Sequence, residues 1–192
     1  MKQTIYNLFP STVFYIEDIL DDIENKKIVD RSLEIYKDTK KGGQQWNCNM
    51  YNTIDTFNLI NDPQFNKIIK TVNKHVQEYA SFMNSNYQYS CKSAWVNVGL
   101  NGTYQEYHHH SRSTISCVYY ADTPEGSGNL IFENPVMDMI PVESINEYKI
   151  ENAETHYFVP KQKSLIIFRS YLRHMVMMGT NKEPRISIAL NF

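Results

Sequence analysis

Residues 185–191 read Arg185-Ile186-Ser187-Ile188-Ala189-Leu190-Asn191, and this stretch indicates the fold. Apolar side chains alternate along it with smaller or polar ones, and successive side chains of a β-strand point to opposite faces of a sheet. The pattern predicts a strand with one face in an apolar core and with Arg185 and Ser187 on the other face. Because an unpaired buried charge is costly, Arg185 is expected to have an anionic partner.

Seven stretches upstream share this character, with short runs of Tyr, Val, Ile, Thr and Phe separated by turn residues. They lie near residues 88–98, 103–110, 113–121, 129–133, 155–159, 163–168 and 173–178. So many strands without helices between them predict an antiparallel sandwich or jelly roll, mainly β. The connection 135–154, with Met137, Met139 and Tyr148, is long enough to be an active-site cover or ordinary surface.

The first third of the chain favours helices that cover one sheet. A first helix is expected where apolar residues recur at helical spacing around the acidic pair Glu17-Asp18: Ile16, Ile19, Leu20 and Ile23. A second is expected after Asp62 and Pro63, which supply an N-cap and a first-turn proline. Its apolar stripe is Phe65, Ile68, Ile69, Val72, Val76, Tyr79 and Met83. We therefore expect one domain over 1–192, with helical support over 1–86 and a jelly-roll core over 87–192.

Composition excludes several classes of protein. The 192 residues are 42% hydrophobic and 13% aromatic, which is enough for a sizeable core and too much for a disordered chain. The formal net charge of -2, with neither half basic, argues against a nucleic-acid partner. No apolar run approaches the roughly 18 residues of a membrane span. Cys48, Cys91 and Cys117 are odd in number and widely spaced, which is typical of reduced thiols.

Three of the six histidines are consecutive, His108-His109-His110, within a strand-like run. Alternation puts His108 and His110 on one face, where two imidazoles can converge on one metal ion. His174, on a later strand, is the candidate for a third ligand. Two close ligands and one distant ligand leave part of the coordination sphere open for substrate. The alternative is a triple histidine that lies on the surface by chance.

Arg185 follows His174 by one hairpin, so the two are expected near each other. The planar guanidinium holds a carboxylate with two parallel hydrogen bonds. Its anionic partner is therefore either the carboxylate of a bound cosubstrate or an internal acid such as Glu133 or Glu106.

At these residues the chain resembles the 2-oxoglutarate- and Fe(II)-dependent oxygenases of phage and bacterial genomes, a jelly-roll family related to prolyl hydroxylases. The resemblance covers nearly the whole chain and rests on the order and spacing of seven segments. These are LFPSTV (8–13), WVN (95–97), HHH (108–110), ISCVYY (115–120), SGNLIFENP (127–135), FRSYLRH (168–174) and RISIALN (185–191).

The resemblance implies a double-stranded β-helix, or jelly roll, with N-terminal helices packed on one sheet and with iron held by His108, His110 and His174. The wider superfamily has Asp or Glu two residues after the first histidine, where this chain has His110. A neutral ligand there leaves more positive charge on the metal. Glu106, of the same strand parity, is a possible substitute ligand.

The resemblance also implies a cosubstrate site. Arg185, helped by the Ser187 hydroxyl, would bind the distal carboxylate of 2-oxoglutarate, with Asn97 and Tyr119 as further contacts. Alternation turns only one of Tyr119 and Tyr120 inward, and the sequence does not say which.

The implied activity is a dioxygenase reaction that uses Fe(II), 2-oxoglutarate and O2 and hydroxylates a substrate while releasing succinate and carbon dioxide. The expected substrate is a small molecule or a peptidyl residue, with no nucleic-acid or membrane partner, in the cytoplasm of a bacterial cell or phage-infected host. Two alternatives stay open: a cupin-like three-histidine metal dioxygenase that does not use 2-oxoglutarate, and a non-catalytic jelly-roll interaction module.

Overall fold

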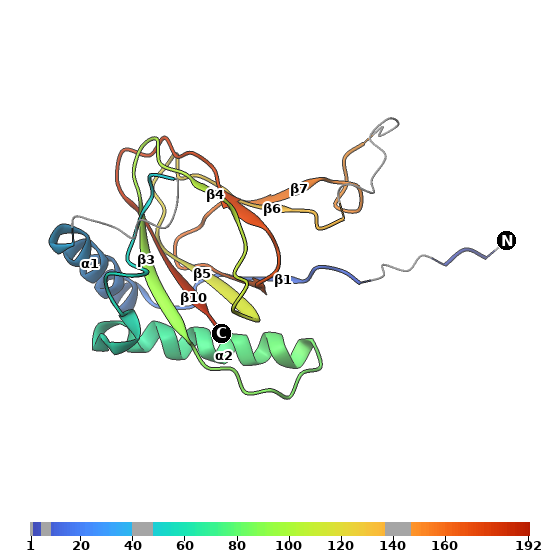
Figure 1. Ribbon diagram of the computed structural model, residues 1–192, viewed down its shortest axis with the longest axis horizontal. Coiled ribbons are helices and arrows are strands. Elements are labelled where there is room, and N and C mark those ends of the chain that lie inside the picture. The colour runs from blue at the N-terminus through green and yellow to red at the C-terminus, as the bar shows by residue number, and fades with distance from the viewer. Residues whose placement is uncertain (1, 5–8, 40–47, 137–146) are drawn as a thin grey trace.

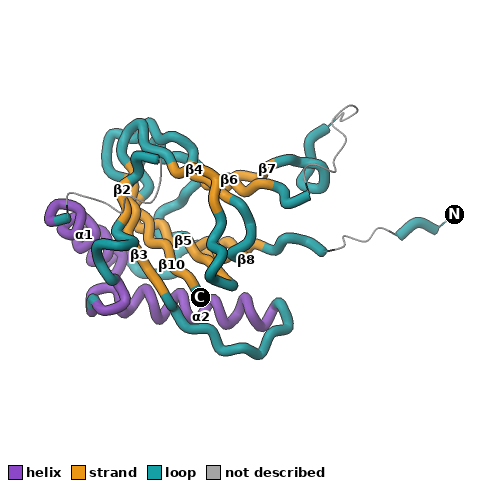
Figure 2. The backbone as a smooth tube through the Cα atoms, in the orientation of Figure 1, coloured by secondary structure: helices purple, strands orange, loops and turns teal. Residues whose placement is uncertain are grey.

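Two antiparallel β-sheets form the body of the protein in the computed structural model, which describes residues 2–4, 9–39, 48–136 and 147–192 (Figures 1 and 2). The larger sheet has six strands in the spatial order β1-β8-β5-β10-β3-β2. The bounds, in that order, are Val13–Ile16, Leu165–Arg169, Ile115–Asp122, Arg185–Asn191, Ser93–Gly99 and Tyr51–Asn52. The smaller sheet has the order β4-β9-β6-β7, with bounds Gln105–His108, His174–Val176, Leu130–Glu133 and Thr155–Phe158.

The eight strands expected from the sequence are all present, and the jelly-roll fold is confirmed. The first 86 residues, expected to be helical support, also contribute β1 and β2, one at each edge of the larger sheet. β1 pairs with β8, and β2 pairs with β3. The N-terminal part of the chain therefore completes the larger sheet as well as covering it.

The helices α1 (Asp22–Asp38) and α2 (Asn66–Phe82) lie on one side of the larger sheet (Figure 1). The second helix is present, but the cap expected for it belongs to the preceding turn. Asp62 accepts a hydrogen bond from the Gln64 amide (2.9 Å) in the 3-10 helix η2 (Pro63–Phe65), and α2 itself begins at Asn66 without a side-chain cap. The 3-10 helix η2 follows a first one, η1 (Leu59–Asn61), with only Asp62 between them. The apolar stripe of α2 packs into the core between helices and sheet, with these residues buried: Ile68, Val72, Val76 and Tyr79.

The expected start of the first helix is wrong. Ile16 lies in β1, and Ile23 is 73% exposed. The helix begins at Asp22, where the Asp21 side chain accepts a hydrogen bond from the Glu24 amide (2.8 Å) and so supplies the N-cap. Asp18 has a φ of 53°, a left-handed conformation that a helix cannot continue through. The acidic pair Glu17-Asp18 therefore lies in the turn between β1 and α1.

The central strand β10 separates two apolar cores. Ile186, Ile188 and Leu190 join the core on the helix side. Arg185 and Ser187 face the other way, into a pocket between the two sheets, as the alternation predicts. The second core fills the rest of that space, with residues from both sheets: Tyr120, Leu130, Phe132, Ile166, Phe168 and Leu172. No helix in the described part of the chain is long and apolar enough to cross a membrane.

Candidate active site

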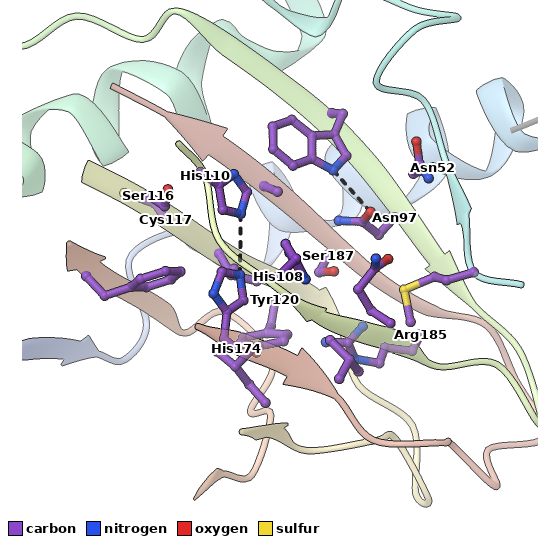
Figure 3. Close-up of a pocket in the computed structure, with 18 residues that line it drawn as sticks. Asn52, Asn97, His108, His110, Ser116, Cys117, Tyr120, His174, Arg185 and Ser187 are labelled. Atoms are coloured by element: carbon purple, nitrogen blue, oxygen red, sulfur yellow. Dashed lines mark hydrogen bonds between the residues drawn. The ribbon is translucent and has the colours of Figure 1, made fainter. Parts of the chain in front are cut away.

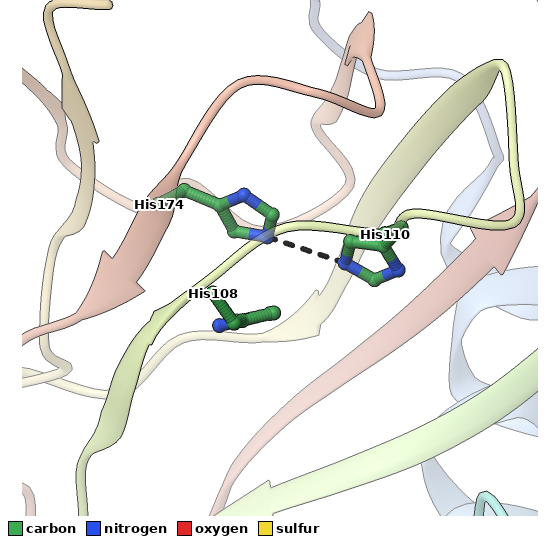
Figure 4. Close-up of side chains that lie close together, drawn as sticks. All are labelled: His108, His110 and His174. Carbon is green, nitrogen blue, oxygen red and sulfur yellow. Dashed lines mark hydrogen bonds between the residues drawn. The ribbon is translucent and has the colours of Figure 1, made fainter.

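Three imidazoles converge at the end of the smaller sheet (Figure 4). His108 is the last residue of β4 and lies opposite His174, the first residue of β9. His110 lies two residues beyond the end of β4, where its backbone amide donates to the carbonyl of Ser170 (2.9 Å). The ligand atoms of the three rings all lie within 4.8 Å of one another. From the sequence, strand alternation is expected to bring His110 beside His108. In the structure, the loop after β4 places His110 there instead.

The hydrogen bonds of the rings leave the correct nitrogens for a metal. His108 Nδ1 donates to the carbonyl oxygen of Glu106 (2.7 Å), and His174 Nδ1 donates to that of Leu172 (2.8 Å). Since a carbonyl only accepts, these neutral rings carry their lone pairs on Nε2, the arrangement usual for metal-binding histidines. His110 Nε2 lies 3.3 Å from His174 Nε2. Two imidazole nitrogens on one ion, each about 2.0–2.1 Å from it, are separated by about 3.0–3.4 Å.

Burial keeps the three rings neutral at physiological pH. It lowers the pKa of His110 to about 4, with help from the neighbouring His108. It also lowers the pKa of His108, and it lowers the pKa of His174 well below its ordinary value. The neutral imidazole is the form that binds a metal ion, so the site is electrostatically ready for a cation.

Arg185 lines the same pocket as the three histidines (Figure 3). The side chain is 2% exposed, and its Nε and Nη1 have no hydrogen-bond partner among the described residues. Neither candidate acid lines the pocket: Glu133 forms an ion pair with Arg173, and the carbonyl of Glu106 accepts from His108. Within the described residues, no internal acid neutralises Arg185. Ser187 and Asn97 also line the pocket.

The two neighbouring tyrosines of β5 have opposite surroundings. Tyr120 lines the pocket, with the Arg185 guanidinium carbon 5.1 Å from its ring centroid and with no hydrogen bond to its hydroxyl among the described residues. Tyr119 points to the helices, where its hydroxyl donates to Asn25 Oδ1 (2.7 Å). The expectation that Tyr119 contacts the cosubstrate is therefore wrong, because β5 turns Tyr120 inward.

Two further pocket residues have no role predicted from the sequence. Trp95 stacks on His110, and its Nε1 donates to Asn97 Oδ1 (3.2 Å). Gln105 lines the pocket although it lies three residues before His108, an odd spacing that should place it on the opposite face. A shift in the β4-β9 pairing brings it inward, and no sequence pattern announces such a shift. Residues 137–146 of the expected cover lie outside the described residues, and Tyr148 is exposed.

This chemistry fits iron and 2-oxoglutarate together. Neutral imidazole nitrogens suit a divalent transition metal, and the unpaired donors of Arg185 and Tyr120 suit a ligand that only accepts hydrogen bonds. The sequence model of the family described as "Putative 2OG-Fe(II) oxygenase" matches residues 93–191, just over half of the chain. The chain belongs to this oxygenase family. The cofactors of the oxygenase are accordingly Fe(II), 2-oxoglutarate and O2.

Solved structures share the oxygenase's fold at low sequence identity. A prolyl-4-hydroxylase from Pseudomonas putida is 11% identical with a TM-score of 0.65, over 94% of this chain and 92% of that one. The viral collagen prolyl hydroxylase of Paramecium Bursaria Chlorella virus-1, a 2-oxoglutarate complex, is 16% identical with a TM-score of 0.60, over 93% and 94%. The epimerase SnoN, with Fe3+, α-ketoglutarate and nogalamycin RO, is 11% identical with a TM-score of 0.68, over 94% and 78%. A comparison with curated protein sequences finds no match.

Proposed function

We propose that this oxygenase hydroxylates a C–H bond of a small-molecule or peptidyl substrate, with iron on His108, His110 and His174 and with 2-oxoglutarate on Arg185. One observation carries the proposal: three imidazoles that can share a metal lie in one pocket with a buried, unpaired guanidinium. A cupin-like enzyme that needs only a metal has no use for that guanidinium, and neither has a non-catalytic module. The guanidinium of Arg185 is costly to bury unless an anion binds beside it.

The metal ligands are held before the metal arrives. Backbone carbonyls fix the rings of His108 and His174 through their Nδ1–H groups, so each Nε2 lone pair points inward. Such contacts orient the rings and make the ligand nitrogens more basic. His110 is positioned from outside by the indole of Trp95. When bound, iron together with 2-oxoglutarate and O2 supplies the oxidising chemistry, and the cosubstrate leaves as succinate and carbon dioxide.

Arg185 orients the cosubstrate in this proposal. Its planar donors match a carboxylate, Ser187 and Tyr120 offer hydroxyl groups beside it, and Asn97 lines the same pocket. Burial lowers the pKa of Arg185, yet the group stays charged because its ordinary pKa is far above neutral. A carboxylate bound there restores a partner to the guanidinium and holds the keto acid in one orientation.

The apolar wall of the pocket limits the access of water. Leu130, Val176 and Phe168 line it from both sheets. Phe168 also contacts the His174 ring edge to face, with centroids 4.8 Å apart. A dry wall strengthens the electrostatic contacts inside the site and protects reactive species from side reactions.

The test measures the binding of metal and cosubstrate. Purified protein is titrated with Mn(II) as an oxygen-stable substitute for Fe(II), and 2-oxoglutarate is then added while unfolding is followed by thermal denaturation. A ligand that binds the native state raises the melting temperature. We expect this rise in the natural chain and in Arg112→Ala, an exposed arginine control, and its loss in Arg185→Ala and Arg185→Lys. A natural chain that binds Mn(II) but shows no response to 2-oxoglutarate contradicts the proposal.

The reaction product separates hydroxylation from other outcomes of C–H oxidation. Two of the similar folds are named as prolyl hydroxylases and one as an epimerase, so the fold is compatible with both outcomes. We propose that the reaction is a hydroxylation. We also propose that the enzyme acts in the cytoplasm. Incubation with candidate peptides and metabolites under 18O2 is expected to give a product heavier by one 18O atom. An isomerised product without added oxygen contradicts hydroxylation while leaving the cofactor assignment intact.

A further inference from the structure

Unpaired hydrogen-bond donors gather in the pocket. Among the described residues, five buried side-chain nitrogen and oxygen atoms lack a hydrogen-bond partner, and four of them belong to Gln105, Tyr120 and Arg185. All three residues line the pocket. Each of these atoms can donate a hydrogen bond. Because buried donors are nearly always paired in a native protein, this cluster indicates a missing ligand that accepts several hydrogen bonds.

Gln105 reaches the pocket through an irregularity of β4. Gln105 lies opposite Val176 and His108 lies opposite His174, so three steps along β4 match two steps along β9. The extra residue of such a β-bulge re-aims the side chains on either side of it. Here it puts Gln105 and His108 in the same pocket, although a regular strand would place them on opposite faces.

A contact outside the proposed cosubstrate site sets the orientation of the Gln105 amide. The thiol of Cys48 donates to Gln105 Oε1 (3.4 Å), which occupies the acceptor end of the amide. The donor end, Nε2, is buried and has no partner among the described residues. The side chain is only 7% exposed, so solvent does not replace that partner. The fixed amide therefore offers its N–H groups to whatever enters the pocket.

We infer that Gln105 is a positioning residue for the cosubstrate, with Nε2 donating to the carboxylate that Arg185 binds; this inference rests on the proposed function. Arg185 and Tyr120 belong to the larger sheet, and Gln105 belongs to the smaller one. A carboxylate has about four lone-pair sites and can accept from all three residues at once. The cosubstrate therefore joins the two sheets through its charged end, and Gln105 favours keto acids that carry a second carboxylate.

The test is isothermal titration of 2-oxoglutarate into the Mn(II)-loaded protein. For Gln105→Leu we expect about 10-fold weaker binding, the effect of one hydrogen bond to a charged group. For Gln105→Glu we expect about 100-fold weaker binding, because the new carboxylate competes for Arg185. The same variant is expected to raise the melting temperature of the ligand-free protein, since the buried guanidinium gains an anion. The matched controls are Gln64→Leu and Gln64→Glu at an exposed glutamine.

Selectivity distinguishes positioning from a general loosening of the fold. The acid 2-oxopentanoate has the same chain length as 2-oxoglutarate and lacks the second carboxylate. We expect Gln105→Leu to bind 2-oxopentanoate as the natural chain does, so that the preference for the dicarboxylate falls about 10-fold. Mn(II) affinity is expected to stay unchanged. Equal weakening for both acids, or unchanged binding of 2-oxoglutarate, overturns the inference.

The outcomes also separate this inference from the proposed function. If the natural chain binds Mn(II) but not 2-oxoglutarate, the proposed function fails. If the natural chain binds 2-oxoglutarate, Arg185→Lys loses it and Gln105→Leu keeps it, only the role of Gln105 fails. Cys48→Ala provides a second, milder variant that leaves the pocket side chains in place. It is expected to weaken 2-oxoglutarate a few-fold by freeing the amide to turn.

Discussion

The indole ring of Trp95 stacks on the imidazole of His110, with ring centroids 5.7 Å apart and planes 23° from parallel. The Nε2 edge of His110 lies 3.3 Å from that of His174, whose ring centroid is 5.2 Å away and whose plane is 5° from parallel. His110 lies past the end of β4, so the strand pairing that orients His108 does not reach it. Trp95, on β3 of the larger sheet, supplies the missing constraint.

Removing the indole is therefore expected to weaken the metal site without removing a ligand. For Trp95→Leu we expect about 10-fold weaker Co(II) binding, in the range of other losses behind metal ligands, and Trp95→Phe should retain part of the affinity. The d–d absorption of bound Co(II) reports changes in coordination directly. Unchanged affinity together with an unchanged spectrum in Trp95→Leu contradicts the role of the stack.

Alanine variants distinguish the three clustered histidines from His109, which is adjacent to two of them in the sequence. His109 is exposed, whereas the clustered rings of His108, His110 and His174 are partly or fully buried. We expect His108→Ala and His174→Ala to lose more than about 100-fold in Mn(II) affinity, more than the loss of an outer contact costs, and His109→Ala to lose nothing. If His108→Ala and His174→Ala bind Mn(II) as tightly as His109→Ala does, the proposed metal site is contradicted.

Exchanging His110 for an acid tests its role as a ligand. A carboxylate binds the same divalent metals and adds a negative charge, so His110→Asp is expected to keep Mn(II) affinity within about 10-fold of the natural chain. His110→Ala offers no ligand and is expected to lose more than about 100-fold. The comparison uses the same Mn(II) titration. Equal affinity in the two variants means that position 110 is not a ligand.

The tyrosine pair of β5 gives opposite expectations for two similar substitutions. Tyr119→Phe leaves the buried Asn25 amide short of a donor and is expected to cost about 1–3 kcal/mol of unfolding free energy, with 2-oxoglutarate affinity unchanged. Tyr120→Phe removes a pocket hydroxyl and is expected to weaken 2-oxoglutarate while changing stability little. Urea denaturation and calorimetric titration measure the two effects, and the reverse assignment would show that Tyr119 faces the cosubstrate.

Stability is expected to fall in alkaline solution. Burial raises the pKa of Tyr79 to about 12 and that of Cys91 to about 11, and it raises the pKa of Tyr119 further. The unfolded chain loses these protons first, so their contribution is complete below about pH 9 and is lost as pH rises toward the folded values. We expect a lower unfolding free energy in urea at pH 11 than at pH 8.

Matched variants assign this alkaline loss to buried groups. Tyr79→Phe removes one titrating hydroxyl and is expected to reduce the difference between pH 8 and pH 11. Tyr148→Phe, at a side chain that is 74% exposed, is expected to leave it unchanged. An unfolding free energy that is flat across this range contradicts the burial of these groups.

The strands could be predicted because their signal is local. Alternation in residues 185–191 needs no partner to be recognised, and it placed Arg185 and Ser187 on the pocket face correctly. The start of α1 could not be predicted in the same way. The spacing of Ile16 and Ile23 is helical, but the left-handed backbone at Asp18 separates them. Periodicity records side-chain types and contains no information on such a turn.

The details of the site depend on long-range pairing. Tyr119 and Tyr120 lie in a strand buried on both faces, so flanking residues give no alternation from which to orient them. The position of Gln105 follows from the β4-β9 register, which only the folded chain sets. The sequence predicts His110 as a candidate ligand because it is a histidine close to His108. Its placement in the structure, however, comes from a loop and from Trp95.

The place of β10 in the larger sheet has a consequence for biosynthesis. β10 lies between β5 and β3, and β9 brings His174 against β4, although both strands follow β4 and β5 by many residues in the chain. A nascent polypeptide on the ribosome therefore exposes His108 and His110 long before their partners exist. The proposed iron site therefore cannot form until β9 has been synthesised and has paired with β4.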